Sequence, residues 1–451
     1  RFKSYGWATI KINGHNHSEI SNSIKEAKKN KRPTLIACKT IIGFGSPNKK
    51  STAASHGSPL GEEEIALTRK KLKWHHAPFE IPDNLIKQWR NFSSKNFKSK
   101  NIWIRNFKKI KNSEKFKMYF NNKLPSELTK KINAFKSVNF IEKTRCATRK
   151  SSEMSLELLT PYLQNLIGGS ADLTGSNNTK TKEQKHITKD DFSGRYIYYG
   201  VREHAMAGIM NGLALHKGIR PYGGTFLVFT DYCRPSIRLA AIMGLPIIYV
   251  MTHDSIGLGE DGPTHQPIEH LSSLRAIPNL NVIRPCDVIE TVEAWQYVTT
   301  NVKNPTVLVL TRQSLPLIRK SHSKQNLVQR GAYPIIDFKN YNATILSTGS
   351  EVEIAVQSSA NLAKVGLKVR VISFPSWELF SKQSKKYQNE IIGNKPIFAI
   401  EAGIINGWEK YIPSENYLGM NKFGSSGPYK KLYKHFGLTD LKLSNLIKKR
   451  I

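Results

Sequence analysis

Short apolar runs recur along the chain between residues 143 and 328, and helical patterns separate them. In chain order the runs read LQNLIGG, YIYYG, LPIIYVM, NLNVI and TVLVL. Strand-length apolar segments that alternate with helices are typical of a parallel sheet whose two faces are both covered. We therefore expect an α/β fold built on parallel sheets.

The length of the chain extends this expectation to several domains. A chain of 451 residues exceeds one ordinary core, and a prior of about 150 residues per domain suggests roughly three. Near the start, PTLIACKTIIGFG predicts a buried strand that runs into a glycine-containing loop, and GEEEIALTRKKL predicts an amphipathic helix. Near the end, NATILSTGSEVEIAVQSSANLAKVGLKVRVISFPS predicts a strand, a helix and a strand. We place the domains at 1–122, 123–330 and 331–451.

The charge balance is strongly basic, with 69 Lys and Arg against 34 Asp and Glu and a formal net charge of +35. Such a balance raises the question of a nucleic-acid or membrane-surface partner. In residues 88–140, which we call the basic connector, lysines and arginines interleave with Phe and Trp and could bind a single-stranded nucleic acid. The same pattern suits surface helices with solvated lysines, and the excess charge is spread along the chain. We favour the second interpretation and expect no nucleic-acid partner.

The sequence gives no sign of export or of a membrane anchor. No apolar run approaches the ~20 residues that span a bilayer, and the N-terminal RFKSYGWATI lacks the apolar stretch of an export signal. Cys38, Cys146, Cys233 and Cys286 lie far apart without a CxxC pair, which favours free thiols over disulfides or a thiolate metal site. We expect a soluble, cytoplasmic protein with no membrane partner.

Polar side chains follow several predicted strands, at the end where parallel α/β sheets bind their ligands. These residues are Ser170, Asp172, His253, Asp254, Asp287 and Arg312. One polar residue at a strand end is commonplace as a helix cap, and Asp254 and Asp287 fit that role. Several strand ends that together carry His, Asp and Arg favour a shared pocket.

Two further features each have a structural and a functional interpretation. Glu203, in YYGVREHAMAGIMNGL, begins an apolar helical pattern and could be an ordinary helix-dipole carboxylate. Burial among its apolar neighbours would instead raise its pKa and allow proton exchange near neutrality. Phe226, Phe229 and Tyr232 have the spacing of one side of a helix, where they could form core packing or hold a flat heteroaromatic ring.

Seven segments, taken together, resemble the transketolase family in the same order and at similar separations across nearly the whole chain. They are CKTIIGFGSPNK, SHGSPLGEEEIALTR, GGSADLTGSN, GVREHAM, HDSIGLGEDGPTHQP, TRQSL and FGSSGP. The segment GEDGPTHQP is among the most diagnostic of that family. Such a series is far more specific than any single motif.

The resemblance implies a thiamine diphosphate enzyme of the non-oxidative pentose phosphate pathway. It would reversibly transfer a two-carbon ketol group from a ketose phosphate to an aldose phosphate. Its diphosphate-binding, pyrimidine-binding and C-terminal domains would form active sites across a homodimer interface. Glu203 resembles the catalytic glutamate that bonds the aminopyrimidine ring, a role that a raised pKa would suit. Phe229, with Phe226 and Tyr232, resembles the pocket that holds this ring, and we assign Asp172 to the same cofactor site.

Sugar phosphates would be the substrates, so the site needs hydroxyl-binding groups near the chemistry and cations further out. His56 resembles the catalytic histidine that touches both the cofactor diphosphate and the substrate. His253, which we also count as catalytic, and Asp261 resemble groups that bind sugar hydroxyls. The residues that resemble the phosphate-binding group are Arg149, Ser176, His265 and Arg312.

The sequence departs from the family pattern at its beginning. We expect the N-terminal part of the diphosphate-binding domain, with its Mg²⁺ ligands, to be missing, and we assign no metal ligand within the chain. A pyrophosphate without metal and N–H donors loses its best anchor, so we expect the chain alone to be inactive. It would be a fragment or would need a separate N-terminal half. Ala54 also stands where the family usually has Asp, which puts the local loop geometry in doubt.

Two rival interpretations stay open at this point. The first is another thiamine diphosphate enzyme, such as deoxyxylulose-phosphate synthase or the β subunit of a 2-oxo acid dehydrogenase, although THQP and CKTIIGFGSPNK argue against both. The second is a non-catalytic remnant that binds nucleic acid through the basic connector.

Overall fold

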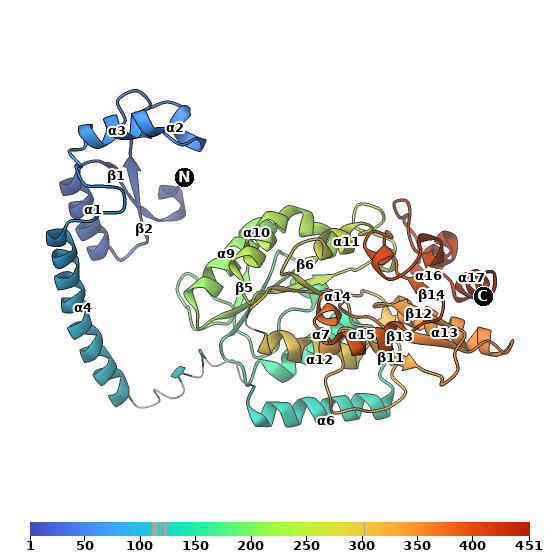
Figure 1. The fold of residues 1–451 in the computed structure, drawn as a ribbon. Helices are drawn as coiled ribbons and strands as arrows, with labels where there is room; N and C mark the ends of the chain where they lie inside the picture. The colour runs from blue at the N-terminus through green and yellow to red at the C-terminus, as the bar shows by residue number, and fades with distance from the viewer. Residues whose placement is uncertain (111–115, 118, 121–123, 302) are drawn as a thin grey trace. The chain divides into compact units, whose positions relative to one another are not determined.

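The computed structural model describes residues 1–110, 116–117, 119–120, 124–301 and 303–451 (Figure 1). The chain divides into two compact units, unit 1 from Arg1 to Lys111 and unit 2 from Asn112 to Ile451. Unit 1 contains a small parallel sheet, and unit 2 contains two larger sheets. The expected α/β fold with parallel sheets is confirmed.

Unit 1 is a β-α-β arrangement followed by three helices. Its elements are β1 (Ala8–Asn13), α1 (His17–Lys29), β2 (Thr34–Lys39), α2 (Ala54–Gly57), α3 (Glu62–Lys71) and α4 (Asp83–Lys109), after a 3-10 turn, η1 (Lys3–Tyr5). The expected strand and helix are therefore present as β2 and α3. The strand is not buried, however, because β2 pairs only with β1 and no residue of it is buried within the described chain.

The basic connector, residues 88–140, is largely helical where it is described. The helix α4 takes up its first part and α6 (Ser126–Glu142) its last part, while residues 111–115, 118 and 121–123 lie outside the described residues. Trp89, Phe92 and Trp103 on α4 are exposed in this structure. The described lysines of α4 are solvated, as the second interpretation of the connector predicted, whereas Lys136 on α6 is buried and pairs with Glu293 at 2.6 Å.

The first sheet of unit 2 has six parallel strands in the order β5-β4-β6-β7-β9-β8. They are β4 (Leu166–Ser170), β5 (Tyr196–Tyr198), β6 (Arg220–Phe226), β7 (Ile248–Thr252), β8 (Asn281–Ile283) and β9 (Thr306–Leu310). The accompanying helices are α7 (Thr148–Leu159), α8 (Thr174–Asn177), α9 (Glu203–His216), α10 (Thr230–Met243), α11 (His270–Arg275) and α12 (Val288–Thr300). Two short strands, β3 (Cys146–Ala147) and β10 (Ser314–Leu315), form a separate antiparallel pair.

Helices cover both faces of this sheet, with α9 and α10 on one face and α7 and α12 on the other (Figure 1). The strand β7 shows why four of its five residues, Ile248 to Met251, are apolar. Tyr249 and Met251 pack against the α9 and α10 side, whereas Ile248 and Val250 pack against the α7 and α12 side. Successive side chains of a strand point to opposite faces, so a strand in a sheet covered on both sides is apolar at most positions.

The second sheet of unit 2 has five strands in the order β11-β13-β12-β14-β15 and is parallel except for β11. The strands are β11 (Tyr333–Ile336), β12 (Ala343–Ser347), β13 (Val369–Ser373), β14 (Ile397–Ile400) and β15 (Tyr417–Leu418). The helices are α13 (Glu351–Ala363), α14 (Trp377–Ser381), α15 (Lys385–Ile392), α16 (Tyr429–Phe436) and α17 (Asp440–Lys448). The remaining 3-10 turns of unit 2 are η2 (Leu227–Phe229), η3 (Ile256–Leu258), η4 (Val328–Arg330), η5 (Trp408–Lys410) and η6 (Ser414–Asn416). Within the described ranges, no helix combines the length and the hydropathy that a bilayer crossing requires.

Candidate active site

An aromatic cluster lies at the carboxyl ends of β6 and β7. The rings of Phe226 and Phe229 stack at 5.7 Å, and those of Phe229 and Tyr232 stack at the same distance. His253 stacks on the ring of Phe226 at 3.7 Å, and His265 meets Phe229 edge-on at 5.5 Å. The predicted pocket residues from three separate segments therefore come together.

The elements that carry these rings differ from the prediction. We expected Phe226, Phe229 and Tyr232 on one side of a single helix. Phe226 is instead the last residue of β6, Phe229 ends the 3-10 turn η2, and Tyr232 lies in the first turn of α10. The spacing is nevertheless compatible with stacking, because the chain turns continuously from the strand into the helix.

His253 occupies an unusual position directly after β7. Its backbone φ is +60°, in the left-handed region that costs energy for residues other than glycine. Its Nδ1 shares a hydrogen bond of 2.9 Å with Thr252 Oγ1, and its side chain is almost fully buried. Burial, followed by the charges of Arg149 and Arg312, lowers the pKa of His253 to about 3. The ring is therefore neutral at physiological pH.

The cationic side of the site consists of Arg149 and Arg312. Arg149 Nη1 donates to the carbonyl oxygen of Ser176 at 2.6 Å, and burial, with repulsion from Arg312, lowers the pKa of Arg149. Arg312 Nη1 donates to the carbonyl oxygen of Leu258 at 2.8 Å. Both guanidinium groups influence the pKa of His253, so they lie within electrostatic reach of its ring. Two cations beside a neutral histidine form an arrangement that can receive a phosphorylated ligand.

Glu203 is the first residue of α9, a helix that packs against α10. Its side chain is buried, and its carboxylate accepts no hydrogen bond from any described residue. Cys233, on α10, indicates what lies near Glu203. Its pKa is raised to about 12, first by burial and then by the charge of Glu203. The Cys233 thiol in turn donates to the carbonyl oxygen of Phe229 at 3.8 Å. Glu203 is therefore a largely buried residue close to Cys233 on α10, the helix that begins next to Phe229.

Three predicted site residues are not shown to join this cluster. Asp172 follows β4 with a φ of +59° and is exposed, and Asp261 is exposed in the loop before His265. His56 lies in unit 1, on the short helix α2, and is also exposed. The roles of these three residues stay predictions.

The loop Gly259–Pro267 is held by a segment more than 150 positions later in the chain. Gln266 Nε2 donates to the carbonyl oxygens of Gly259 and Ser425, at 2.9 Å in both cases. Ser426 Oγ donates to the carbonyl oxygen of Glu260 at 2.5 Å. The segment between β15 and α16 therefore fixes the loop that carries His265.

Arg284, directly after β8, was not predicted as a site residue. It is fully buried, and its Nε and Nη2 donate to Asp254 Oδ2 at 2.9 and 2.7 Å. Its Nη1 donates to Glu351, the first residue of α13. Burial alone would lower the pKa of Arg284, but Glu351 and Asp254 raise it well above its ordinary value. Since Asp254 follows His253, this ion pair fixes the strand end that carries the histidine.

The two aspartates that fitted helix caps have different roles. Asp254 is an ion-pair partner of Arg284 and caps no helix. Asp287 is a cap, because its side chain accepts from the backbone N–H of Glu290 at 2.8 Å at the start of α12. The same residue type after a strand therefore serves two purposes in this fold.

Three family models match the chain in succession. The thiamine diphosphate binding domain of transketolase matches residues 1–128, the transketolase pyrimidine binding domain matches residues 144–318, and the transketolase-like C-terminal domain matches residues 331–439. The chain belongs to the transketolase family. The aromatic cluster thus lies within the pyrimidine-binding domain, and the prediction of a transketolase is confirmed.

Curated relatives agree with this assignment. The chain is 46% identical to a transketolase from Cereibacter sphaeroides over 451 residues, which cover all of this chain and 68% of the relative. It is 43% identical to a transketolase from Sinorhizobium medicae over 442 residues, which cover 97% of this chain and 64% of the relative. The chain spans about two thirds of the length of these relatives.

Solved transketolase structures have the same fold. The enzyme from Leishmania mexicana superposes with a TM-score of 0.90 at 38% identity, over 99% of this chain and 67% of that chain. A transketolase from Pichia stipitis in complex with sedoheptulose 7-phosphate gives the same TM-score at 36% identity, with the same coverage.

The expectation that the N-terminal part of the diphosphate-binding domain is missing gains no support from these matches. The model of that domain matches from residue 1 onward. The related expectations of a separate N-terminal half, of a fragment and of an inactive chain depended on the same argument and are equally unsupported. The same matches favour transketolase over the other thiamine diphosphate enzymes and over a nucleic-acid-binding remnant.

Proposed function

We propose that this chain transfers a two-carbon ketol group from a ketose phosphate to an aldose phosphate, with thiamine diphosphate as cofactor, in the non-oxidative pentose phosphate pathway. The observation that carries the proposal is the aromatic cluster at the start of α10, with the largely buried Glu203 close enough to that helix to raise the pKa of Cys233. A flat heteroaromatic ring needs an aromatic surface to stack on and a polar partner at its edge. Phe229 and Glu203 would supply these two parts.

The residues of the pyrimidine-binding domain fit the cofactor. Phe229 is only partly buried, and its ring stacks with those of Phe226 and Tyr232, so these three side chains form an aromatic surface that a flat ring could join. Glu203 would hold a proton at the ring nitrogen of the aminopyrimidine. Thiamine diphosphate, when bound, supplies the electron sink that carbon–carbon cleavage requires. Asp172 and His56 belong to this site in the proposal, and Mg²⁺ would accompany the diphosphate through ligands that we do not assign.

The substrate side of the proposal rests on the cations. Arg149 and Arg312 would bind the phosphate, together with Ser176 and His265. The neutral ring of His253, with Asp261, would bind sugar hydroxyls, because a neutral imidazole both donates and accepts. The Pichia stipitis transketolase in complex with sedoheptulose 7-phosphate supports this substrate class.

A homodimer is part of the same proposal. Apolar side chains on the outer surface of α9 and α10 are exposed in the single chain, and we call this surface the α9–α10 face. Its members are Ile209, Leu215, Leu239, Ile242 and Met243. An apolar patch of this kind favours a protein partner, and a second copy is the partner that the family resemblance implies.

The remaining predictions complete the proposal. We retain the domain bounds 1–122, 123–330 and 331–451, whereas the family models match residues 1–128, 144–318 and 331–439. A cytoplasmic location is supported by the four cysteines, all of which are free thiols.

The test is a coupled assay on the full chain, with thiamine diphosphate and Mg²⁺. We expect turnover with xylulose 5-phosphate as donor and an aldose phosphate as acceptor, and none with pyruvate. Consumption of pyruvate would contradict the proposal. So would a long incubation with bound cofactor in which neither sugar phosphate is consumed.

A further inference from the structure

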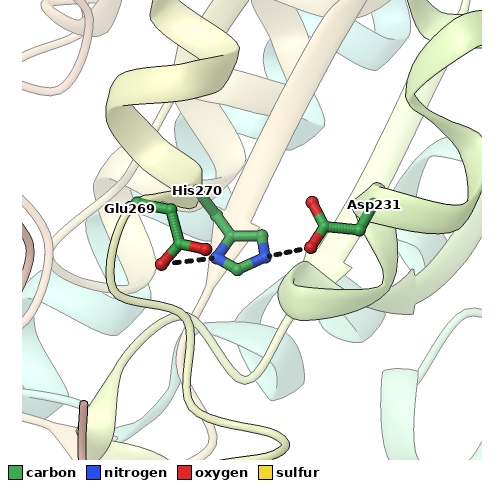
Figure 2. Close-up of side chains that lie close together, drawn as sticks. All are labelled: Asp231, Glu269 and His270. Carbon is green, nitrogen blue, oxygen red and sulfur yellow. Dashed lines mark hydrogen bonds and ion pairs between the residues drawn. The ribbon is translucent and has the colours of Figure 1, made fainter.

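A second cluster of polar groups lies between the start of α10 and the start of α11, apart from the ring-stacking residues. Asp231, Glu269 and His270 each offer one ligand atom, and these atoms all lie within 4.8 Å of one another (Figure 2). Asp231 and Glu269 are about half exposed, whereas His270 is only 4% exposed. Among the His, Cys, Asp and Glu side chains of the described residues, these three form the group that could hold a metal ion.

The histidine ring has one partnered and one unpartnered nitrogen. His270 Nε2 lies 3.1 Å from Asp231 Oδ2. An ionised carboxylate can only accept, so in the neutral ring Nε2 carries the proton and Nδ1 carries the lone pair. His270 Nδ1 is buried and has no hydrogen-bond partner among the described residues. A buried acceptor left in this state costs roughly 1–3 kcal/mol.

The carboxylate of Glu269 faces His270 Nδ1 and adds an electrostatic cost to the missing hydrogen bond. Glu269 Oε2 lies 3.9 Å from His270 Nδ1, on the opposite side of the ring from Asp231 (Figure 2). A lone pair and a carboxylate that face each other repel, and either a proton on Nδ1 or a metal cation between the two atoms would remove this repulsion. Arg234 does not fill this gap, because its Nη2 faces the other carboxylate, 3.9 Å from Asp231 Oδ1, and its Nη1 donates to the carbonyl oxygen of Ser273.

We propose that Asp231, Glu269 and His270 form a binding site for a divalent transition metal such as Zn²⁺. His270 Nδ1 and the Glu269 carboxylate are the ligands, and water completes the coordination. Asp231 orients the imidazole by accepting from Nε2, the relation that most metal-bound histidines have with a nearby carboxylate. The site is separate from the diphosphate-bound Mg²⁺ of the proposed function and does not depend on it.

The geometry needs only a small adjustment. Ligand atoms about 2.0–2.1 Å from a tetrahedral metal are roughly 3.3 Å from each other, so the 3.9 Å between Nδ1 and Oε2 must shorten by about 0.6 Å. The half-exposed side chain of Glu269 can rotate by this amount. The imidazole ligand favours Zn²⁺ or Co²⁺ over Mg²⁺, which prefers oxygen ligands.

The test titrates the full, EDTA-treated chain with Zn²⁺ alone by calorimetry, and with Co²⁺ by visible absorption. We expect His270→Gln and Glu269→Gln each to lose one equivalent of bound metal. Asp231→Asn, which removes only the orienting contact, should weaken binding about 10–100-fold. Millimolar Mg²⁺ should not displace the bound metal.

The matched control is His76→Gln with Glu80→Gln, an exposed pair in unit 1 with a similar separation of 4.0 Å between Nδ1 and Oε1. This control should retain the metal, because no carboxylate of the described residues accepts a hydrogen bond from the His76 imidazole and both members of the pair are exposed. Glu269 is half exposed, so its variant should fold normally even where a His270 variant does not, as far-UV circular dichroism would verify. Equal metal stoichiometry and affinity in wild type and Glu269→Gln would overturn the proposal, as would the absence of Zn²⁺ binding to the wild type above the control.

Discussion

Replacement of Arg284 by Met should strongly destabilise unit 2. Arg284 is the shared cation of two buried carboxylates, Asp254 from the pyrimidine-binding domain and Glu351 from the C-terminal domain. Methionine is similar in length but leaves both carboxylates without that partner in an environment that water does not reach. Removal of one member of a buried ion pair typically costs about 3–5 kcal/mol.

The magnitude can be followed by thermal unfolding. At about 2 °C per kcal/mol for a large domain, the loss corresponds to a fall in Tm of about 6–10 °C. Intrinsic fluorescence reports on this region, because Trp295 lies in the first sheet's core and Trp408 in the second's. Addition of Asp254→Asn to the Arg284→Met variant should restore part of the lost stability, since it removes one of the uncompensated charges.

The control for this prediction is Arg450→Met. Arg450 pairs with Glu415 at 3.6 Å on the surface, and such pairs contribute at most about 1 kcal/mol. The reasoning would be refuted if Arg284→Met unfolded within 2 °C of Arg450→Met, a margin of about 1 kcal/mol. That result would mean that the two domains do not depend on the buried network.

Two further predictions concern His253 and the α9–α10 face. The folded-state pKa of His253 is about 3 against an ordinary value of 6.5, so the unfolded chain binds a proton in this window that the folded chain does not. The contribution of His253 is therefore fully present above pH 6.5 and lost as the pH falls toward 3, with a slope of about 1.4 kcal/mol per pH unit. His253→Asn should flatten the dependence of the unfolding free energy on pH between pH 6.5 and 3. The control His216→Asn changes an exposed histidine and should leave this dependence unchanged. Parallel curves for both variants would contradict the burial argument. On the α9–α10 face, Ile242→Lys should shift the chain from dimer to monomer in analytical ultracentrifugation, while Ile141→Lys on α6, where the side chain is at least as exposed, should leave the dimer intact. An unchanged dimer in the first variant would rule out this face as the interface.

Part of this structure could be predicted because local patterns determine it. The apolar runs identify five of the six strands of the first sheet, since a strand covered on both faces is apolar at most positions. The strand β6 was not predicted, because its sequence RPYGGTF contains Arg, Pro and two Gly and leads directly into residues with helical spacing. Its last residue, Phe226, was consequently placed on a helix, although Phe226 and Phe229 were correctly expected to lie together.

Other features depend on which surfaces meet, and the sequence carries little information about that. Arg284 follows the strand NVI just as His253 follows its own strand, so the signal for a polar strand end was present. Its partner Glu351 is 67 positions later in another domain, and no local pattern links the two. The pairing of His270 with Asp231, 39 positions earlier, is equally invisible in the sequence. The exposed surface of β2 was missed because an apolar run predicts a strand but does not reveal what covers it.

The most direct test of the central claim compares Glu203→Gln with wild type in the ketol-transfer assay, under saturating thiamine diphosphate. Glutamine keeps the shape of the side chain but cannot hold the proton, so we predict a fall in kcat of about 10²–10⁴-fold with an unchanged Tm. The exposed Glu183→Gln serves as control and should retain full activity. Turnover by Glu203→Gln within twofold of the wild type would contradict the assignment of this buried carboxylate to the cofactor.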